Sequence, residues 1–282
     1  MATEEVDWMN ELAARFLSTS DIDLYNFVSR GKKSVTVNAR PLFLAFEEFI
    51  SEEMSFLECL DALSDVAKTA GIETYGSPPS QGSLNNCRGQ WFELIFFKYF
   101  WDELRKHEGD GRDFLRMPSA TKKKKITDLF LPEQNKEIRK LRPATSNPDY
   151  LVLANLDDLI TDLENPWYEN FQQVDFFGRV DLTKITAILS IKTESRPDRK
   201  YQLLHEANMA KTICSISYNH NIKFVAVDLV SKKANEEAFE SSSILSMVEN
   251  KHLGTELSKT IDYSITLNKI SDVSKVYSVL FD

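Results

Sequence analysis

No apolar run in the sequence approaches the about 18 residues that a membrane-spanning helix requires. The N-terminus, MATEEVDWMNELAARF, is acidic and amphipathic, without the basic segment and apolar core of a signal peptide. Only three cysteines are present, Cys59, Cys87 and Cys214, and none has CxxC or histidine spacing. These absences argue against a membrane protein, a disulfide-rich secreted protein and a zinc module, so we expect a cytoplasmic protein.

Positive charge is also in short supply, since 43 acidic residues outnumber 34 lysines and arginines and give a net charge of −9. This balance argues against a protein that coats nucleic acid without specificity. It does not exclude a site-specific DNA enzyme, because attraction to DNA depends on local charge. At 282 residues, with 42% hydrophobic and 27% charged residues, the chain has the profile of an ordinary globular protein.

The hydrophobic periodicity predicts helices in the first part of the chain and alternating strands and helices after it. Residues 1–70 favour helices, one of which opens with Ser55 and Glu58 at capping-box spacing and is expected to end at Gly71. A turn-rich loop at 72–84 and a long helix at 86–107 follow. The expected later strands are 113–118, 149–155, 186–193, 223–230, 262–267 and 274–281, and the expected later helices are 121–141, 197–217 and 234–249.

This order predicts an α/β fold with a central mixed β-sheet flanked by helices and a helical N-terminal part. The segment TAILSIKT at 186–193 is nearly all apolar, which is typical of a strand that is buried on both faces. Pro197 suits the first turn of the helix that follows it.

Three acids and one lysine have spacings that favour metal-dependent phosphodiester hydrolysis. Asp149 opens a strand after Pro148, Lys192 ends the apolar strand, and Glu206 follows fourteen residues later on the next helix. Glu93 lies among apolar residues of the helix at 86–107, where an ionised carboxylate is rarely buried without a partner. Carboxylates hold Mg²⁺, and an ammonium group stabilises charge that develops on a phosphate. Each residue alone also has a structural explanation as a turn residue, a solvated lysine or an ion-pair partner.

The strand departs from the acid-x-Lys pattern of many nucleases, because Ser190 stands where the acid is expected. Serine cannot supply the negative charge that a metal site requires. Glu206 on the following helix can return a carboxylate to this position. The helical spacing of Leu203, Ala207 and Ala210 lets these residues face the sheet, while Glu206 points along the edge of the sheet toward the end of the strand.

Several segments between residues 82 and 211 resemble the motifs of one family and follow each other in that family's order. They are GSLNNCRGQWFE (82–93), RMPSAT (116–121), SNPD (146–149), SIKTESRPDR (190–199) and QLLHEA (202–207). Together they resemble the CCGG-recognising Type II restriction endonucleases, a variant of the PD-(D/E)xK superfamily in which the second acid lies on the helix. The resemblance implies a restriction-endonuclease-like core at 81–282 with a helical N-terminal region, 1–80, packed on it.

The resemblance also implies the roles of the residues. Asp149 and Glu206 would bind Mg²⁺, and Lys192 would orient the attacking water and stabilise negative charge. Glu93 would be an outer acid of the same catalytic group. Ser190 would occupy the vacated acid position, supporting the site without binding the metal.

The segment Arg196-Pro197-Asp198-Arg199 has the chemistry to read two G·C pairs. An arginine fork bridges the N7 and O6 acceptors of guanine, and a carboxylate accepts from cytosine N4 in the major groove. Arg196 and Arg199 would each contact a guanine, and Asp198 would accept from two cytosines. A surface ion-pair network at a helix start is the alternative for these residues taken alone.

Lesser candidates lie outside this segment. Lys122 and Lys123 open a run of four lysines that fits phosphate contacts, although a solvated helix face explains it nearly as well. Asn86 fits either a minor-groove contact or a helix cap. His205, beside Glu206, fits a structural role better than acid–base chemistry.

The partners implied are double-stranded DNA and a second copy of the chain, since a palindrome read by a two-fold axis requires at least a homodimer. A tetramer of two dimers stays open, and a cognate methyltransferase is expected in the host. Cleavage before the first C would leave 5′ CCGG overhangs. Two further hypotheses are a structure-specific or repair nuclease of the same superfamily and a DNA-binding protein without catalysis.

Overall fold

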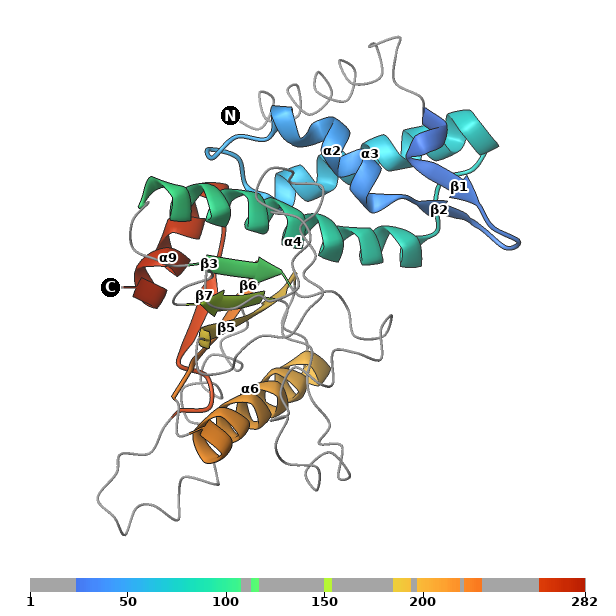
Figure 1. Cartoon of the computed structure of the whole chain (residues 1–282). Coiled ribbons are helices and arrows are strands. Elements are labelled where there is room, and N and C mark those ends of the chain that lie inside the picture. Colours follow the sequence, from blue (N-terminus) through green and yellow to red (C-terminus); the bar gives the residue numbers. More distant parts are fainter. Residues whose placement is uncertain are drawn as a thin grey trace, which may run out of the picture. The chain divides into compact units, whose positions relative to one another are not determined.

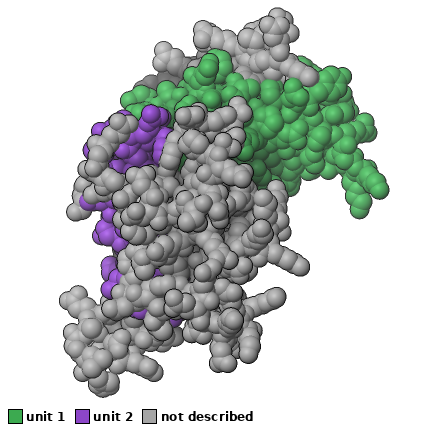
Figure 2. All heavy atoms as spheres, in the orientation of Figure 1, with its two compact units in different colours: residues 1–99, 267–273 green, residues 100–266, 274–282 purple. Residues whose placement is uncertain are grey.

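The computed structural model describes residues 24–107, 113–116, 150–153, 185–193, 197–218, 221–229 and 259–281 (Figure 1). These residues form two compact units, coloured separately in Figure 2. Unit 1 comprises the described residues up to Tyr99 together with Leu267–Val273, and unit 2 comprises those from Phe100 to Thr266 together with Ser274–Phe281. The expected division at residue 80 stays a prediction. None of the helices described has both the length and the hydrophobicity needed to cross a lipid bilayer.

Unit 1 is mainly helical but begins with a short β-hairpin. Its elements are η1 (Leu24–Asn26), β1 (Val28–Arg30), β2 (Val35–Val37), α2 (Ala39–Phe46), η2 (Glu47–Phe49), α3 (Phe56–Tyr75), η8 (Ile270–Asp272) and the first part of α4 (Gln81–Lys106).

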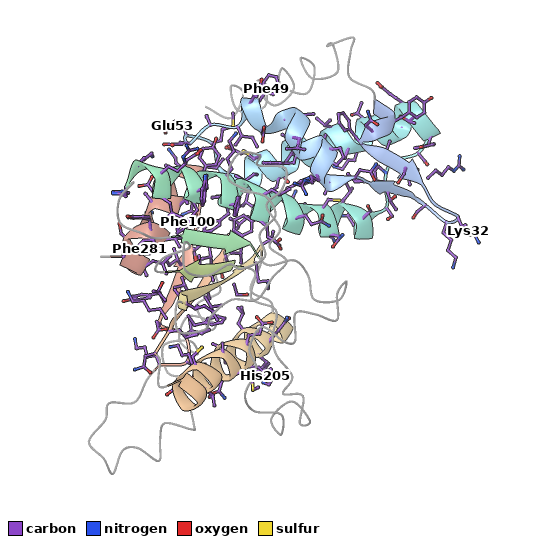
Figure 3. The ribbon with its side chains drawn as sticks, viewed as in Figure 1. Lys32, Phe49, Glu53, Phe100, His205 and Phe281 are labelled. Atoms are coloured by element: carbon purple, nitrogen blue, oxygen red, sulfur yellow. The ribbon has the colours of Figure 1, made fainter. Side chains whose placement is uncertain are left out.

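The hairpin shows that the expectation of helices throughout 1–70 is wrong for residues 28–37. β1 and β2 pair antiparallel, with Val28 opposite Val37, and Lys32 lies at the turn between them (Figure 3). Val28 and Val35 are buried against Ala70 of α3. These β-branched residues favour a strand, and their burial against α3 is a tertiary contact that periodicity within the segment does not reveal.

Helix α3 begins with the predicted capping box. Glu58 N–H donates to Ser55 Oγ at 3.2 Å, and Ser55 N–H donates to Glu58 Oε2 at 3.0 Å. The expected end at Gly71 is wrong, because α3 continues to Tyr75 and ends at Gly76, whose φ of 70° suits glycine. Gly71 is instead a point of close approach, since a Cβ there would lie 2.7 Å from Pro79 Cδ.

Helix α4 extends the predicted helix at 86–107 by five residues at its start, so Asn86 lies within the helix and not at its cap. Trp91 Nε1 donates to Ala39 O at 2.8 Å, and the rings of Phe56 and Phe92 meet edge to face at 5.1 Å. Both contacts lie in the buried interior of unit 1.

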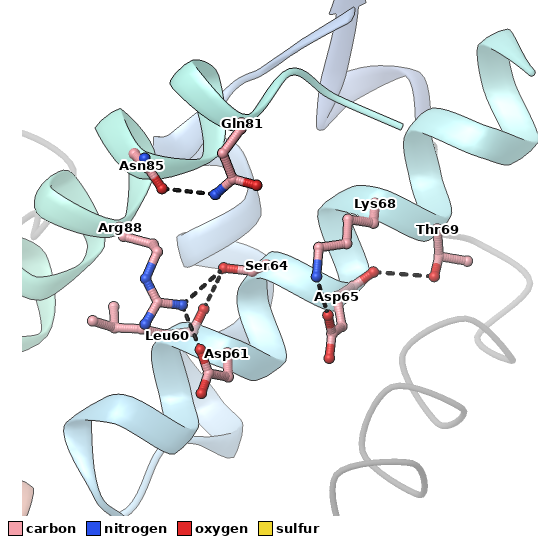
Figure 4. A network of polar contacts seen from close by, with 9 residues as sticks. All are labelled: Leu60, Asp61, Ser64, Asp65, Lys68, Thr69, Gln81, Asn85 and Arg88. Carbon is pink, nitrogen blue, oxygen red and sulfur yellow. Dashed lines mark hydrogen bonds and ion pairs between the residues drawn. The ribbon is translucent and has the colours of Figure 1, made fainter. Parts of the chain in front are cut away.

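A polar network ties α4 to α3 at the surface of unit 1 (Figure 4). Arg88 Nη1 contacts Asp61 Oδ1 at 2.5 Å and Ser64 Oγ at 3.3 Å. Ser64 Oγ in turn donates to Leu60 O at 2.6 Å. Arg88 of α4 therefore binds both a carboxylate and a buried hydroxyl group of α3.

Unit 2 contains a five-stranded sheet in the order β3-β4-β5-β6-β7. Its strands are β3 (Asp113–Arg116), β4 (Tyr150–Leu153), β5 (Ile185–Lys192), β6 (Lys223–Asp228) and β7 (Tyr263–Thr266). The pairs β3/β4 and β4/β5 are antiparallel, and β5/β6 and β6/β7 are parallel. The predicted mixed sheet is therefore confirmed.

Among the described residues of unit 2, the helices α6 (Pro197–Tyr218) and α9 (Val273–Phe281) lie next to this sheet, α6 below it and α9 to its left in Figure 1. The strand expected at 274–281 is wrong, because this segment is α9. Its valines and aromatic residues favour a strand, but the buried positions 273, 276, 277 and 280 follow helical spacing. Lys223 Nζ donates to Val279 O and Leu280 O, both at 3.2 Å, and so binds the end of this helix.

The helices expected at 121–141 and 234–249 lie outside the described residues. The strands expected at 113–118, 149–155, 186–193, 223–230 and 262–267 are present at nearly the predicted positions.

Candidate active site

Strand β5 carries two of the predicted site residues on one face of the sheet. Ser190 is fully buried, and Lys192, the last residue of the strand, is half-buried. Side chains two positions apart in a strand point to the same side, so Ser190 and Lys192 share a face. The ladders with β4 and β6 define this register, and a slip of one residue would move both polar side chains to the other face.

Helix α6 presents Glu206 from its buried side. Glu206 is 5% exposed, and Leu203, Ala207 and Ala210 around it are buried as their spacing predicts. Gln202 Nε2 donates to Glu206 Oε1 at 2.8 Å, one turn earlier in the helix. His205, the residue directly before Glu206, is exposed on α6 (Figure 3). A carboxylate held inside a protein requires compensation by donors or a cation.

Asp149 lies outside the described residues, but the strand that follows it is placed. Tyr150, the first residue of β4, pairs with Leu189 of β5, and Leu151 pairs with Ile188. Leu189 directly precedes Ser190. The first residue of β4 is therefore a neighbour of the part of β5 that carries Ser190 and Lys192.

Two polar residues that the sequence did not single out lie on the next two strands at the level of Lys192. Asp228, the last residue of β6, is the ladder partner of Lys192, and Thr266 of β7 is the ladder partner of Asp228. Thr266 Oγ1 donates to Asp228 Oδ1 at 2.8 Å, and Asp228 is 4% exposed. The signal in the sequence is an acid that ends the apolar strand KFVAVD, because carboxyl ends of parallel strands meet at one edge.

The predicted reading segment is placed in part. Pro197 begins α6 as predicted, and Asp198 and Arg199 lie in its first turn. Arg196 and the side chains of Asp198 and Arg199 lie outside the described residues, and so do Lys122 and Lys123. The DNA contacts of these residues stay predictions.

Glu93 and Asn86 both lie on α4 in unit 1, whereas Lys192 and Glu206 lie in unit 2. Glu93 is half-buried, next to the buried Trp91 and Phe92, and Asn86 is exposed. The role of Glu93 toward the residues of unit 2 stays a prediction.

The donor chemistry fits a hard divalent cation in part. Glu206 offers the buried carboxylate oxygens that Mg²⁺ prefers. Within the ranges that the structure describes, no group of three or more histidines, cysteines and acids could hold a metal ion. Asp149, the other predicted ligand, is not among those residues.

Comparison with solved structures shows that the chain has the fold of a restriction endonuclease. The Bse634I restriction endonuclease superposes with a TM-score of 0.72 at 20% identity, over 93% of this chain and 100% of that chain. The Type IIF restriction endonuclease Bse634I with cognate DNA gives a TM-score of 0.71 at 21% identity over the same shares.

Comparison of the sequence with known proteins identifies the family. The Type II restriction enzyme Cfr10I of Citrobacter freundii is 26% identical over 215 residues, which are 68% of this chain and 74% of that enzyme. The model of the Cfr10I/Bse634I restriction endonuclease family matches residues 24–281. The chain belongs to this family and is therefore a Type II site-specific endonuclease. The predicted family, fold class and enzyme class are confirmed.

Proposed function

We propose that the protein is a Mg²⁺-dependent restriction endonuclease that cleaves double-stranded DNA at a palindrome with a central CCGG. It cuts before the first C and leaves 5′ CCGG overhangs. The observation that carries this proposal is the continuity of β5 and α6, in which Lys192 ends a buried strand, the Pro197-Asp198-Arg199 turn follows, and Glu206 is buried on the same helix.

Asp149 and Glu206 are the proposed ligands of Mg²⁺, one before β4 and one on α6. When bound, the ion neutralises charge on the phosphate and lowers the pKa of a coordinated water. Glu93 supplies an outer carboxylate to the same group. Ser190 takes the position of the acid in the usual acid-x-Lys pattern. Its burial supports this view, because a small uncharged side chain is more easily buried there than a carboxylate.

Lys192 acts on the water and the phosphate. Its ammonium orients the attacking water and stabilises the negative charge that develops on the phosphate oxygens. A half-buried position at the carboxyl end of β5 suits this role. The amine can reach DNA bound at the surface, while the aliphatic part of the lysine side chain packs on the sheet.

Arg196, Asp198 and Arg199 read the CCGG bases from the turn before α6 and from its first turn. The arginines bridge guanine N7 and O6, and Asp198 accepts from cytosine N4. Lys122, Lys123 and Asn86 contact the DNA backbone or the minor groove around this site.

The proposed assembly is a homodimer at least, with each subunit reading one half of the palindrome. A pair of dimers would bind two sites at once. The comparison that supports a DNA partner is the similarity of this fold to that of Bse634I with cognate DNA.

Mapping the ends of cleaved DNA tests the proposal. The protein is incubated with Mg²⁺ and a plasmid of known sequence, and the fragments are sequenced at both ends. Discrete fragments that begin with 5′ CCGG are expected. Cutting at branched junctions without regard to sequence would show a structure-specific nuclease, and specific binding without any cutting would show a DNA-binding protein. Either result contradicts the proposal.

A further inference from the structure

Lys192, Asp228 and Thr266 lie at one level across three parallel strands. Lys192 pairs with Asp228 in the β5/β6 ladder, and Asp228 pairs with Thr266 in the β6/β7 ladder. Paired residues of neighbouring strands point to the same face, and the strands are about 4.8 Å apart. Asp228 is therefore the direct neighbour of the proposed catalytic lysine, at the edge where β5 ends.

The burial of Asp228 requires an explanation that its strand does not supply. It is 4% exposed and follows four buried apolar residues of β6. A carboxylate in such a place is costly unless donors or a cation compensate its charge. Thr266 Oγ1 supplies one hydrogen bond to Oδ1, at 2.8 Å. A hydroxyl donor fixes the orientation of the carboxylate but does not neutralise it.

Lys192 carries an ammonium group and is the ladder partner of Asp228 on the neighbouring strand. We infer that Asp228 is a positioning residue, whose carboxylate holds the Lys192 ammonium toward the scissile phosphate while Thr266 holds Asp228. The inference rests on the proposed role of Lys192 in cleavage. A lysine stem has four rotatable bonds, so a fixed anion beside it reduces the number of orientations that the amine explores before reaction.

Cleavage kinetics test this role through Asp228→Asn, which keeps the size of the side chain and removes its charge. Under single turnover with excess enzyme, we expect the rate constant to fall about tenfold, below the 10²–10³-fold typical of losing a direct donor to the reacting oxygens. Affinity for a CCGG duplex, measured with Ca²⁺ in place of Mg²⁺, should stay unchanged. Asp228→Glu should recover part of the rate, and Thr266→Val should lower it less than Asp228→Asn, with Thr266→Ser as its matched control.

A double-mutant cycle separates positioning from a general structural effect. If Asp228 acts through Lys192, adding Asp228→Asn to Lys192→Gln should leave the residual rate nearly unchanged, because the group that it positions is gone. An equal loss in both backgrounds would overturn the inference and would point to a direct or structural role of Asp228.

Chemical labelling gives a second readout that does not depend on activity. Reductive methylation of Lys192, followed by mass spectrometry at constant pH, should be faster in Asp228→Asn than in the wild type, while Lys98 of unit 1 is labelled at the same rate in both. Equal labelling of Lys192 in the two proteins would contradict the inference. If Lys192 is labelled faster in Asp228→Asn than in the wild type but the wild type cuts no DNA, the proposed function fails and the pairing of the two residues stands.

Discussion

Lys211 Nζ of α6 lies 2.5 Å from Asp262 Oδ2, at the entrance to β7. The Lys211 side chain is 5% exposed, and its amine also donates to Lys259 O at 2.7 Å. Asp262 Oδ2 accepts a second bond, from Phe224 N–H of β6, at 2.6 Å. An ion pair between a buried lysine and a half-buried aspartate therefore joins the helix that carries Glu206 to the sheet, five residues after the proposed metal ligand.

Removing the cation of this pair should destabilise the protein strongly. Lys211→Met leaves the Asp262 carboxylate without its ammonium partner. Breaking a fully buried pair in this way costs about 3–5 kcal/mol, and because Asp262 is 27% exposed we expect a loss at the lower end of this range. Urea unfolding measures the loss. Lys68→Met is the control, because Lys68 and Asp65 are 2.7 Å apart but about half exposed, and such pairs contribute only about 0–1 kcal/mol. Equal losses in the two variants would contradict the importance of burial.

Lys192→Ala should nearly abolish cleavage, leaving only a small residual rate, and should leave specific binding largely intact. The ammonium is proposed to act on the reacting phosphate and water, so its removal should lower the single-turnover rate by about 10²–10³-fold or more. Binding to a CCGG duplex is measured in parallel. Lys32→Ala, at the exposed hairpin turn, is the control and should cut normally. Normal cutting by Lys192→Ala would show that the site is assigned to the wrong residue.

Asp198→Ala should change which DNA is cut. Loss of an acceptor for cytosine N4 removes about 1–3 kcal/mol of discrimination per base contact. The ratio of cleavage rates at CCGG and at duplexes with one changed base measures this loss. A variant that keeps the wild-type ratio would place base reading elsewhere.

The three cysteines should be unreactive in the folded protein. Burial raises the pKa of Cys59 from 9.0 to about 12 and those of Cys87 and Cys214 to about 11. A colorimetric thiol reagent at pH 8 should therefore find almost no reactive thiol before unfolding and three after it. Rapid reaction of any of them in the native state would contradict their buried positions.

The same shifts give a dependence of stability on pH. Unfolded thiols lose their protons near pH 9, whereas the folded ones keep them to about pH 11–12. The unfolded state then binds fewer protons, so the contribution of the thiols to stability falls as pH rises through this window. Urea unfolding at pH 8 and pH 10 should show this fall in the wild type relative to a triple Cys→Ala variant. An identical pH dependence in both would contradict it.

Local patterns predicted much of the fold and of the candidate site. The apolar run of β5, Pro197 at the start of α6 and the Ser55–Glu58 capping box each act within a few residues, and all are present. The family resemblance rested on segments of the same kind. Asp149, Arg196, Lys122 and Lys123 lie outside the described residues, so their roles stay predictions.

The errors arose where distant parts of the chain decide the local structure. Gly71 is buried beside Pro79, so the helix passes through a residue that would otherwise end it. The hairpin at 28–37 depends on packing against Ala70. Asp228 was missed because its importance follows from the strand register, which pairs it with Lys192 across thirty-six residues of sequence.

Metal-directed cleavage of the protein tests most directly whether Asp149 and Glu206 hold one divalent ion. Fe²⁺ replaces Mg²⁺ in the presence of a CCGG duplex, and ascorbate with peroxide then breaks the polypeptide near the bound iron. We expect breaks close to residues 149 and 206 that excess Mg²⁺ suppresses and that Glu206→Gln loses. Breaks at other positions, or unchanged breaks in Glu206→Gln, would contradict the shared site.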